Sequence, residues 1–210
     1  MSAQPTSLVD SVGGVRGMVE TSVPAVAFVI AYAVSGSDTR FSAIVAIALA
    51  AALAISRIAR RETPQFALSG LFGVAIAAVF ATKTGKAENF YLPGLLANAG
   101  YALGFLVSIL VRHPLVGVIA TQLLGAKGDK NWREDPVRMR TYTRLSWLWV
   151  ALFSTRLAVQ LPLYLAGAVV ALGIARTAMG IPLFALGLWV TYRAVTSARD
   201  AQPGGTSPSK

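Results

Sequence analysis

The sequence of 210 residues contains no cysteine and only one histidine, His113. The absence of cysteine excludes disulfides, thiolate metal ligands and a thiol nucleophile, and a single histidine excludes a multi-histidine metal site. Charged residues make up only 13% of the chain, whereas hydrophobic residues make up 55%. A mean hydropathy of +0.60 also lies outside the usual balance of soluble domains, in which about 25% of residues are charged. The composition indicates a membrane protein, and we expect neither a metal ion nor a cofactor.

Six apolar segments are predicted to cross the membrane as helices, with snorkelling side chains or bilayer thinning accommodating the shorter ones. They are residues 21–35, 41–56, 65–82, 91–111, 145–165 and 178–195. A further apolar piece, 114–124, is too short to cross and is followed by Gly125, so it is interpreted as an interfacial helix. Residues 166–176 are also short and end at Arg176, and the sequence leaves open whether they cross, re-enter or lie flat. The predicted fold is all-α, a polytopic membrane helical bundle of about six transmembrane helices.

Three regions follow from this pattern. Residues 1–18 lack the features of a signal peptide, so we expect a retained cytoplasmic N-terminal segment. Residues 19–196 form the predicted transmembrane bundle, which includes a basic cytoplasmic loop over residues 126–144. Residues 197–210 are small, polar and proline-containing, which predicts a disordered cytoplasmic tail.

The basic residues are distributed unevenly between alternate loops, and this asymmetry orients helical membrane proteins. With the N-terminus in the cytoplasm, fourteen basic residues fall on the cytoplasmic side and four on the other side. The arginine and alanine bias is typical of a GC-rich bacterial genome, so we predict a bacterial plasma (inner) membrane protein with both termini cytoplasmic. The four basic residues assigned to the outer side are Arg40, Lys83, Lys86 and Arg176.

The net charge of +10 is interpreted as contact with the lipid bilayer and its anionic headgroups, or with an acidic partner, rather than with nucleic acid. The glycines and lysines of residues 125–130 lack the context of a phosphate-binding loop. The residues predicted to contact lipid headgroups or a partner are Lys127, Lys130, Arg133, Arg138, Arg140 and Arg144.

Arg156 lies near the middle of the fifth predicted span, where a permanent charge costs at least about 2.5 kcal/mol. No Asp or Glu lies inside a predicted span. One interpretation is that Arg156 binds an anionic ligand or lipid phosphate, with Gln160 one turn further along the same face. The other is that Arg156 bonds helix carbonyls freed by Pro162 and fixes the packing. Asn98 and Tyr101 of the fourth span either line the same cavity or form interhelical hydrogen bonds.

Aromatic residues and the histidine have simpler interpretations. Trp147 and Trp149 follow Arg144, where an aromatic belt is expected at the membrane interface. His113 is expected to cap the C-terminal end of the fourth span, since imidazolium suits a helix C-terminus. No nucleophile, acid pair or histidine cluster accompanies these residues, so we expect no catalytic residue and no enzyme.

Several motifs follow one another in a characteristic order along the chain. They are Pro64-Gln65, Thr84-Gly85-Lys86-Ala87-Glu88-Asn89-Phe90, His113-Pro114-Leu115-Val116, Leu123-Leu124-Gly125, Trp132 and Tyr142-Thr143-Arg144-Leu145-Ser146-Trp147-Leu148-Trp149. This order resembles the intracellular septation protein A family, and the chain is also similar to an actinobacterial integral membrane family of unknown function. The resemblance implies an inner-membrane protein of cell-envelope maintenance or division that acts through protein partners. The chain departs from the septation proteins at Arg156, Gln160 and Pro162.

Three classes of function remain for such a chain. A structural or interaction protein of the envelope needs a helical bundle and a charged loop, and we favour it. A passive or anion/lipid-binding small-solute transporter or channel would use Arg156, but no intramembrane carboxylate is present for a proton or sodium relay. A membrane enzyme is the third class, and its usual acid, thiol and histidine groups are missing from the spans.

Overall fold

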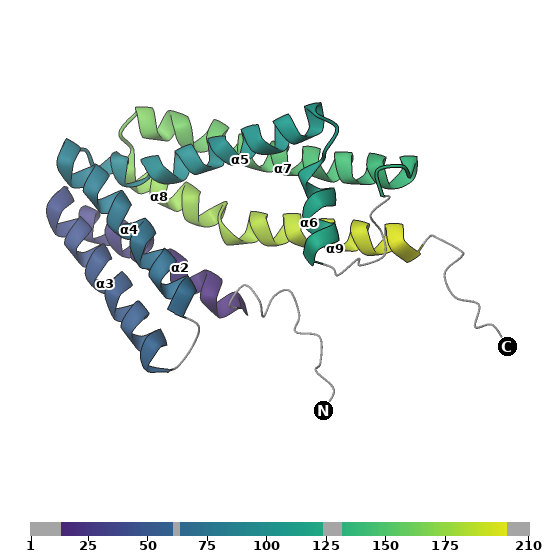
Figure 1. Cartoon of the computed structure of the whole chain (residues 1–210). Coiled ribbons are helices and arrows are strands. Elements are labelled where there is room, and N and C mark those ends of the chain that lie inside the picture. Colours follow the sequence, from purple (N-terminus) through teal and green to yellow (C-terminus); the bar gives the residue numbers. More distant parts are fainter. Residues whose placement is uncertain (1–13, 61–63, 124–131, 201–210) are drawn as a thin grey trace. The chain divides into compact units, whose positions relative to one another are not determined.

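The computed structural model describes residues 14–60, 64–123 and 132–200 (Figure 1). Within these ranges every regular element is helical, which confirms the all-α prediction. The helices are α2 (Gly14–Val34), α3 (Thr39–Ala59), α4 (Pro64–Thr84), the 3₁₀ turn η1 (Ala87–Phe90), α5 (Leu92–Leu110), α6 (Leu115–Leu123), α7 (Pro136–Leu165), α8 (Val169–Ala178) and α9 (Ile181–Asp200).

Four helical stretches of the described chain are long and apolar enough to cross a membrane. They are Thr39–Ala59, Leu92–Leu110, Pro136–Leu165 and Val169–Ser197, the last of which joins α8 and α9. Two more apolar helical stretches, Ser22–Val34 and Leu68–Thr84, lie within α2 and α4, which have 21 residues each. They coincide with the first and third predicted spans, so each of the six predicted spans corresponds to an apolar helical stretch.

Helix α7 begins well before the predicted span, inside the predicted loop 126–144. Asp135 precedes the helix and its Oδ1 accepts the N–H of Val137 at 2.8 Å, which is the usual role of an N-cap carboxylate. Pro136 occupies the first helical position, where no N–H is needed. The charged residues after Pro136 suggested a loop, but these end signals start a helix there.

Other boundaries also differ from the sequence prediction. α2 begins at Gly14, inside the predicted segment 1–18, and α9 continues to Asp200, inside the predicted tail 197–210. Residues 201–210 lie outside the described residues. The short apolar piece that was expected to end at Arg176 forms α8, which carries Arg176 in its last turn, where a cation suits the helix C-terminus.

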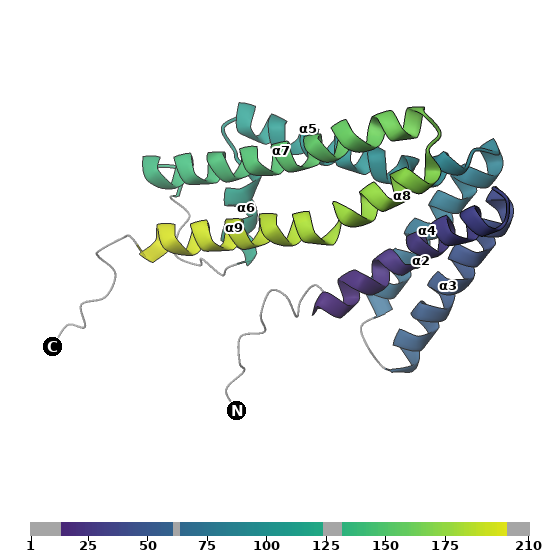
Figure 2. The same cartoon turned by 180° about the vertical axis from the view of Figure 1, so that it is seen from behind.

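The chain folds as two compact units. Unit 1 comprises residues 1–96 and 159–181, and unit 2 comprises residues 97–158 and 182–210. In unit 1, α3 packs along both α2 and α4 (Figures 1 and 2). The contact face of α3 is lined by alanines at helical spacing, and these are Ala43, Ala46, Ala50 and Ala54. Small side chains allow helix backbones to approach closely.

The remainder of the unit 1 core is aromatic. The ring of Phe28 stacks on that of Phe90 with centroids 4.0 Å apart. Tyr91 packs its edge against both rings, at 6.2 Å from Phe28 and 5.5 Å from Phe90. Such pairs contribute about 0.5–1.5 kcal/mol beyond the burial of their area. The cluster therefore ties η1 and the start of α5 to α2.

The core of unit 2 contains more bulky aromatic side chains. Trp132 and Tyr142 meet edge to face at 5.2 Å, and Trp149 stacks near Phe105 at 5.9 Å. The indole N–H of Trp149 donates to the Thr191 hydroxyl at 3.1 Å and so links α7 to α9. A buried indole N–H needs such a partner. Trp149 is therefore a core residue rather than the interfacial anchor expected from the sequence.

Candidate functional site

The four predicted ligand-binding residues lie on two helices. Arg156 is partly buried on α7, and Gln160, one turn further along, is 2% exposed. Arg156 is engaged in an interaction within the chain. On α5, Asn98 is partly buried, whereas Tyr101 is 56% exposed and its ring lies 5.2 Å from that of Phe153. That these four residues line one ligand site stays a prediction.

The predicted headgroup residues fall into different environments. Lys127 and Lys130 lie outside the described residues. Arg133, Arg140 and Arg144 are exposed and so are accessible to a lipid or a partner.

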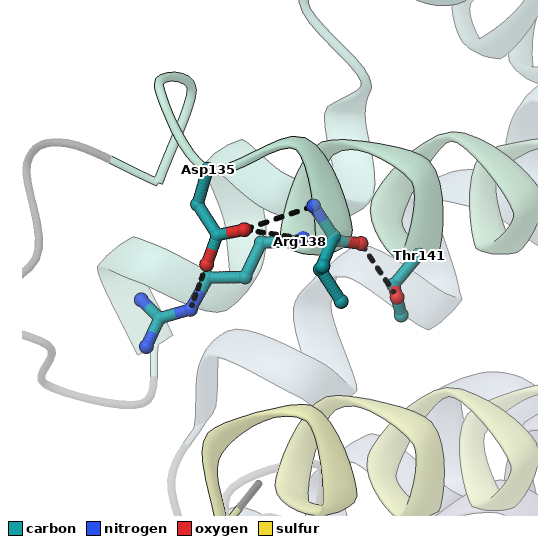
Figure 3. A network of polar contacts seen from close by, with 4 residues as sticks. Asp135, Arg138 and Thr141 are labelled. Atoms are coloured by element: carbon teal, nitrogen blue, oxygen red, sulfur yellow. Dashed lines mark hydrogen bonds and ion pairs between the residues drawn. The ribbon is translucent and has the colours of Figure 1, made fainter. Parts of the chain in front are cut away.

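Arg138, in contrast, is 7% exposed. Its Nε lies 3.4 Å from a carboxylate oxygen of Asp135, in an ion pair between residues three positions apart (Figure 3). The same carboxylate caps α7, and the adjacent turn is closed by the Thr141 hydroxyl, which donates to the Val137 carbonyl at 3.0 Å (Figure 3). The guanidinium of Arg138 is thus used to hold the start of α7.

His113 is exposed after the end of α5. Its Nδ1 lies 2.8 Å from the carbonyl oxygen of Val111, so an N–H at this nitrogen would donate to a carbonyl near the helix C-terminus. This geometry agrees with the expected capping role. No group of three or more His, Cys, Asp or Glu side chains that could hold a metal ion occurs among the described residues.

A second arginine site was not predicted from the sequence, and it lies within unit 1. The side chain of Arg176, in the last turn of α8, places its Cζ 5.6 Å from the centroid of the Tyr91 ring. The guanidinium also lies against Gly94 in the first turn of α5, since a Cβ at Gly94 would be 2.9 Å from Cζ. A side chain larger than that of glycine at position 94 would displace the guanidinium from this position.

Tyr91 is fully buried beneath this guanidinium. Its hydroxyl has no hydrogen-bond partner among the described residues. A buried donor without an acceptor is uncommon in proteins.

A hydrogen-bonded pair flanks Tyr91 in the same unit. The Tyr164 hydroxyl donates to the side-chain oxygen of Asn89 at 2.5 Å. The amide of Asn89 donates in turn to the Thr84 hydroxyl at 2.8 Å. These bonds join the end of α7 to η1 and α4, so the backbone that carries Tyr91 is fixed from two sides. All three side chains have partners, which sets them apart from Tyr91 and Arg176.

No carboxylate forms an ion pair with Arg176 among the side chains that the structure describes. The sequence alone showed an arginine in an apolar run, which marks an expensive charge. It did not show the proximity of Tyr91 and Gly94, because these residues are distant from Arg176 along the chain. Arg176 was consequently assigned to a loop on the outer side.

The four long apolar helical stretches indicate a multi-pass helical membrane protein. The chain belongs to the family described as protein of unknown function DUF3159, whose family model matches residues 12–202. No curated protein and no solved structure matches the chain.

Proposed function

We propose that this protein is a structural or interaction protein of the bacterial inner membrane, with six crossings and both termini in the cytoplasm. The fourteen-to-four distribution of basic residues in the sequence supports this orientation. The resemblance to septation protein A supports a role in cell-envelope maintenance or division through partners.

The observation that carries the proposal is the firmly held start of α7, which bears exposed basic residues. We call the exposed residues Arg133, Arg140 and Arg144 the basic platform. Arg133 is held over the ring of Trp132, with its Cζ 5.3 Å from the ring centroid, and Trp132 is itself buried. A cation near an anionic bilayer surface contributes about 1 kcal/mol. The platform therefore suits anionic headgroups or an acidic protein surface.

The experiment is purification in native lipid discs followed by mass spectrometry of bound lipids and crosslinked proteins. The double variant Arg140→Gln/Arg144→Gln is compared with Lys83→Gln/Lys86→Gln, which removes the same charge from exposed residues of the proposed outer side. We expect the first variant to bind the anionic lipid or acidic partner about thirtyfold more weakly, since two cations are lost. The control should behave as the wild type.

Equal retention of lipid and partner by both double variants would contradict the platform. Failure to enrich any anionic lipid or acidic protein with the wild-type chain would contradict the interaction role itself. The two results are distinguishable because the second does not involve a substitution.

A second proposed function, passive or anion-selective transport, is supported by a different observation. The apolar stretch of the last two helices is interrupted, since α8 ends at Ala178 and α9 begins at Ile181, and discontinuous helices are common in transporters. Arg156 and Gln160 would then contact the anion. Chloride or phosphate flux into liposomes, compared between wild type and Arg156→Gln, tests it, and no flux above empty liposomes would exclude it.

A further inference from the structure

The guanidinium of Arg176 has an incomplete set of partners. It packs over the face of Tyr91, and a contact of this kind uses the plane of the guanidinium rather than its N–H groups. No hydrogen bond or ion pair joins those N–H groups to any side chain or backbone that the structure describes. An arginine has five such donors in a fixed fork, which suits an oxyanion. Arg176 as a whole residue is partly exposed.

The N-terminal turn of α5 adds a second source of positive potential at the same place. The helix begins at Leu92, and the first N–H groups of a helix have no acceptor within it. Pro93 has no N–H, which leaves those of Leu92 and Gly94. Because the guanidinium lies against Gly94, a cation and the positive end of a helix meet without a described carboxylate between them. Such a pair repels unless an anion lies nearby.

The hydroxyl of Tyr91 is a third donor, and it belongs to the residue whose ring lies under the guanidinium of Arg176. A Cβ on Gly173 would lie 2.8 Å from the hydroxyl oxygen, so this oxygen lies over the backbone of α8, one turn before Arg176. The hydroxyl is buried and has no acceptor among the described residues. A bound oxyanion would supply one.

We infer that Arg176, the first turn of α5 and the Tyr91 hydroxyl form a binding site for a phosphate group. A phosphate has several acceptor oxygens and can therefore accept from separate donors, including a bidentate bond from the guanidinium. The group is carried by a phospholipid headgroup or is free inorganic phosphate. This site is distinct in its residues from the basic platform and does not depend on it.

Two exposed lysines of the same unit lie outside the site. Lys83 is in the last turn of α4, and Lys86 precedes η1. They serve as controls for the loss of an exposed positive charge.

The test measures binding to the purified full chain in a neutral detergent. Native mass spectrometry gives the affinity for phosphatidic acid and phosphatidylglycerol, with diacylglycerol as the probe that lacks phosphate. Calorimetry with inorganic phosphate, against chloride, gives the affinity for the free ion. Tight binding of the two lipids without the free ion identifies a headgroup site, and binding of inorganic phosphate identifies a free-ion site. Binding of diacylglycerol as tight as phosphatidic acid would overturn the inference.

Arg176→Gln should weaken phosphate binding by at least about tenfold, because it removes a charge-assisted bond. Tyr91→Phe should weaken it severalfold, since only one neutral donor is lost. The matched control Lys83→Gln removes one exposed positive charge and should bind almost as the wild type does. A loss in Lys83→Gln equal to that in Arg176→Gln would show a non-specific charge effect and overturn the site.

Arg176→Lys and Tyr91→Phe keep the inference falsifiable if Arg176→Gln does not fold. Arg176→Lys keeps the charge but loses the fork geometry, so severalfold weaker binding is expected. Wild-type affinity in both Arg176→Lys and Tyr91→Phe would overturn the inference, as would the absence of phosphate binding by the wild-type chain.

Discussion

Each of the two units holds a largely enclosed arginine, and the two arginines are treated differently. In unit 2, Arg138 is ion-paired with Asp135, three residues earlier on the same segment. In unit 1, Arg176 rests on the ring of Tyr91, and no described carboxylate pairs with it. A guanidinium that is paired within the chain serves the fold, whereas one without a described carboxylate partner can serve a ligand.

The cores of the units differ in a related way. Unit 1 packs alanines of α3 and α4 between backbones, and unit 2 packs Trp132, Tyr142, Trp149 and Phe153. Alanine contacts depend on close approach, so they tolerate added volume poorly. Bulky aromatic contacts depend instead on hydrogen bonds and on ring geometry. Substitutions in the two units should therefore fail for different reasons.

The largest expected effect is that of Arg138→Gln. The substitution leaves the carboxylate of Asp135 without its ion pair and removes a buried side chain, so we expect a loss of about 2 kcal/mol of stability, below the value for a fully buried pair because Asp135 is partly exposed. Thermal unfolding in detergent measures it. Arg140→Gln, an exposed arginine of the same helix, is the control and should change stability by less than about 0.5 kcal/mol. An equal loss of stability in Arg138→Gln and Arg140→Gln would show that the ion pair of Arg138 does not stabilise unit 2.

Ala46→Leu is expected to cost about 1.5 kcal/mol, because Ala46 is fully buried on α3 and added methyl groups overpack a close helix contact. Ala48→Leu on the exposed face of α3 is the matched control. The melting temperatures of the two variants are measured in detergent, and that of Ala46→Leu is expected to be lower. A melting temperature for Ala46→Leu as high as that of the control would show that α3 is not closely packed.

Thr191→Val should cost about 1 kcal/mol, since it leaves the indole N–H of Trp149 without its acceptor. The control is Thr177→Val, because the Thr177 hydroxyl also donates to a carbonyl of its own helix but accepts no described hydrogen bond. Fluorescence of Trp149 should shift only in Thr191→Val. Equal effects of the two substitutions on stability and on fluorescence would contradict a stabilising role of the hydrogen bond between Trp149 and Thr191.

The smallest effect on stability is expected for Arg176→Gln in the absence of ligand. The substitution removes one cation–π contact, worth about 0.5–1 kcal/mol, and relieves the burial of a charge. The stability of Arg176→Gln and of the wild type is measured by thermal unfolding without and with phosphatidic acid. A loss without ligand that matches that of Arg138→Gln would make Arg176 a structural residue like Arg138.

Local signals in the sequence predicted much of the fold. The alanine repeat of α3 and the short apolar run 114–124, which forms α6 (Leu115–Leu123), gave helices where expected. The start of α7 was missed although Asp135 and Pro136 signal it, because the charges after them were interpreted as a loop.

The site at Arg176 could not be predicted from the sequence, and the reason is physical. Arg176 meets Tyr91 and Gly94 only because α8 packs near the start of α5, and no local pattern encodes that contact. Gly94 is one of several glycines in the sequence of α5, and nothing in the local pattern distinguishes it from the others. Helix packing, rather than any motif, brings the cation to the helix end.

The orientation of the protein in the membrane is the central claim, and the absence of cysteine allows a direct test. Single cysteines at the exposed positions Lys86, Arg133 and Ser197 are treated in intact cells with a maleimide that does not cross the membrane. The proposed topology predicts labelling of Lys86→Cys in intact cells, and of Arg133→Cys and Ser197→Cys only after the membrane is opened. Labelling of Arg133→Cys or Ser197→Cys in intact cells, or protection of Lys86→Cys, would contradict it.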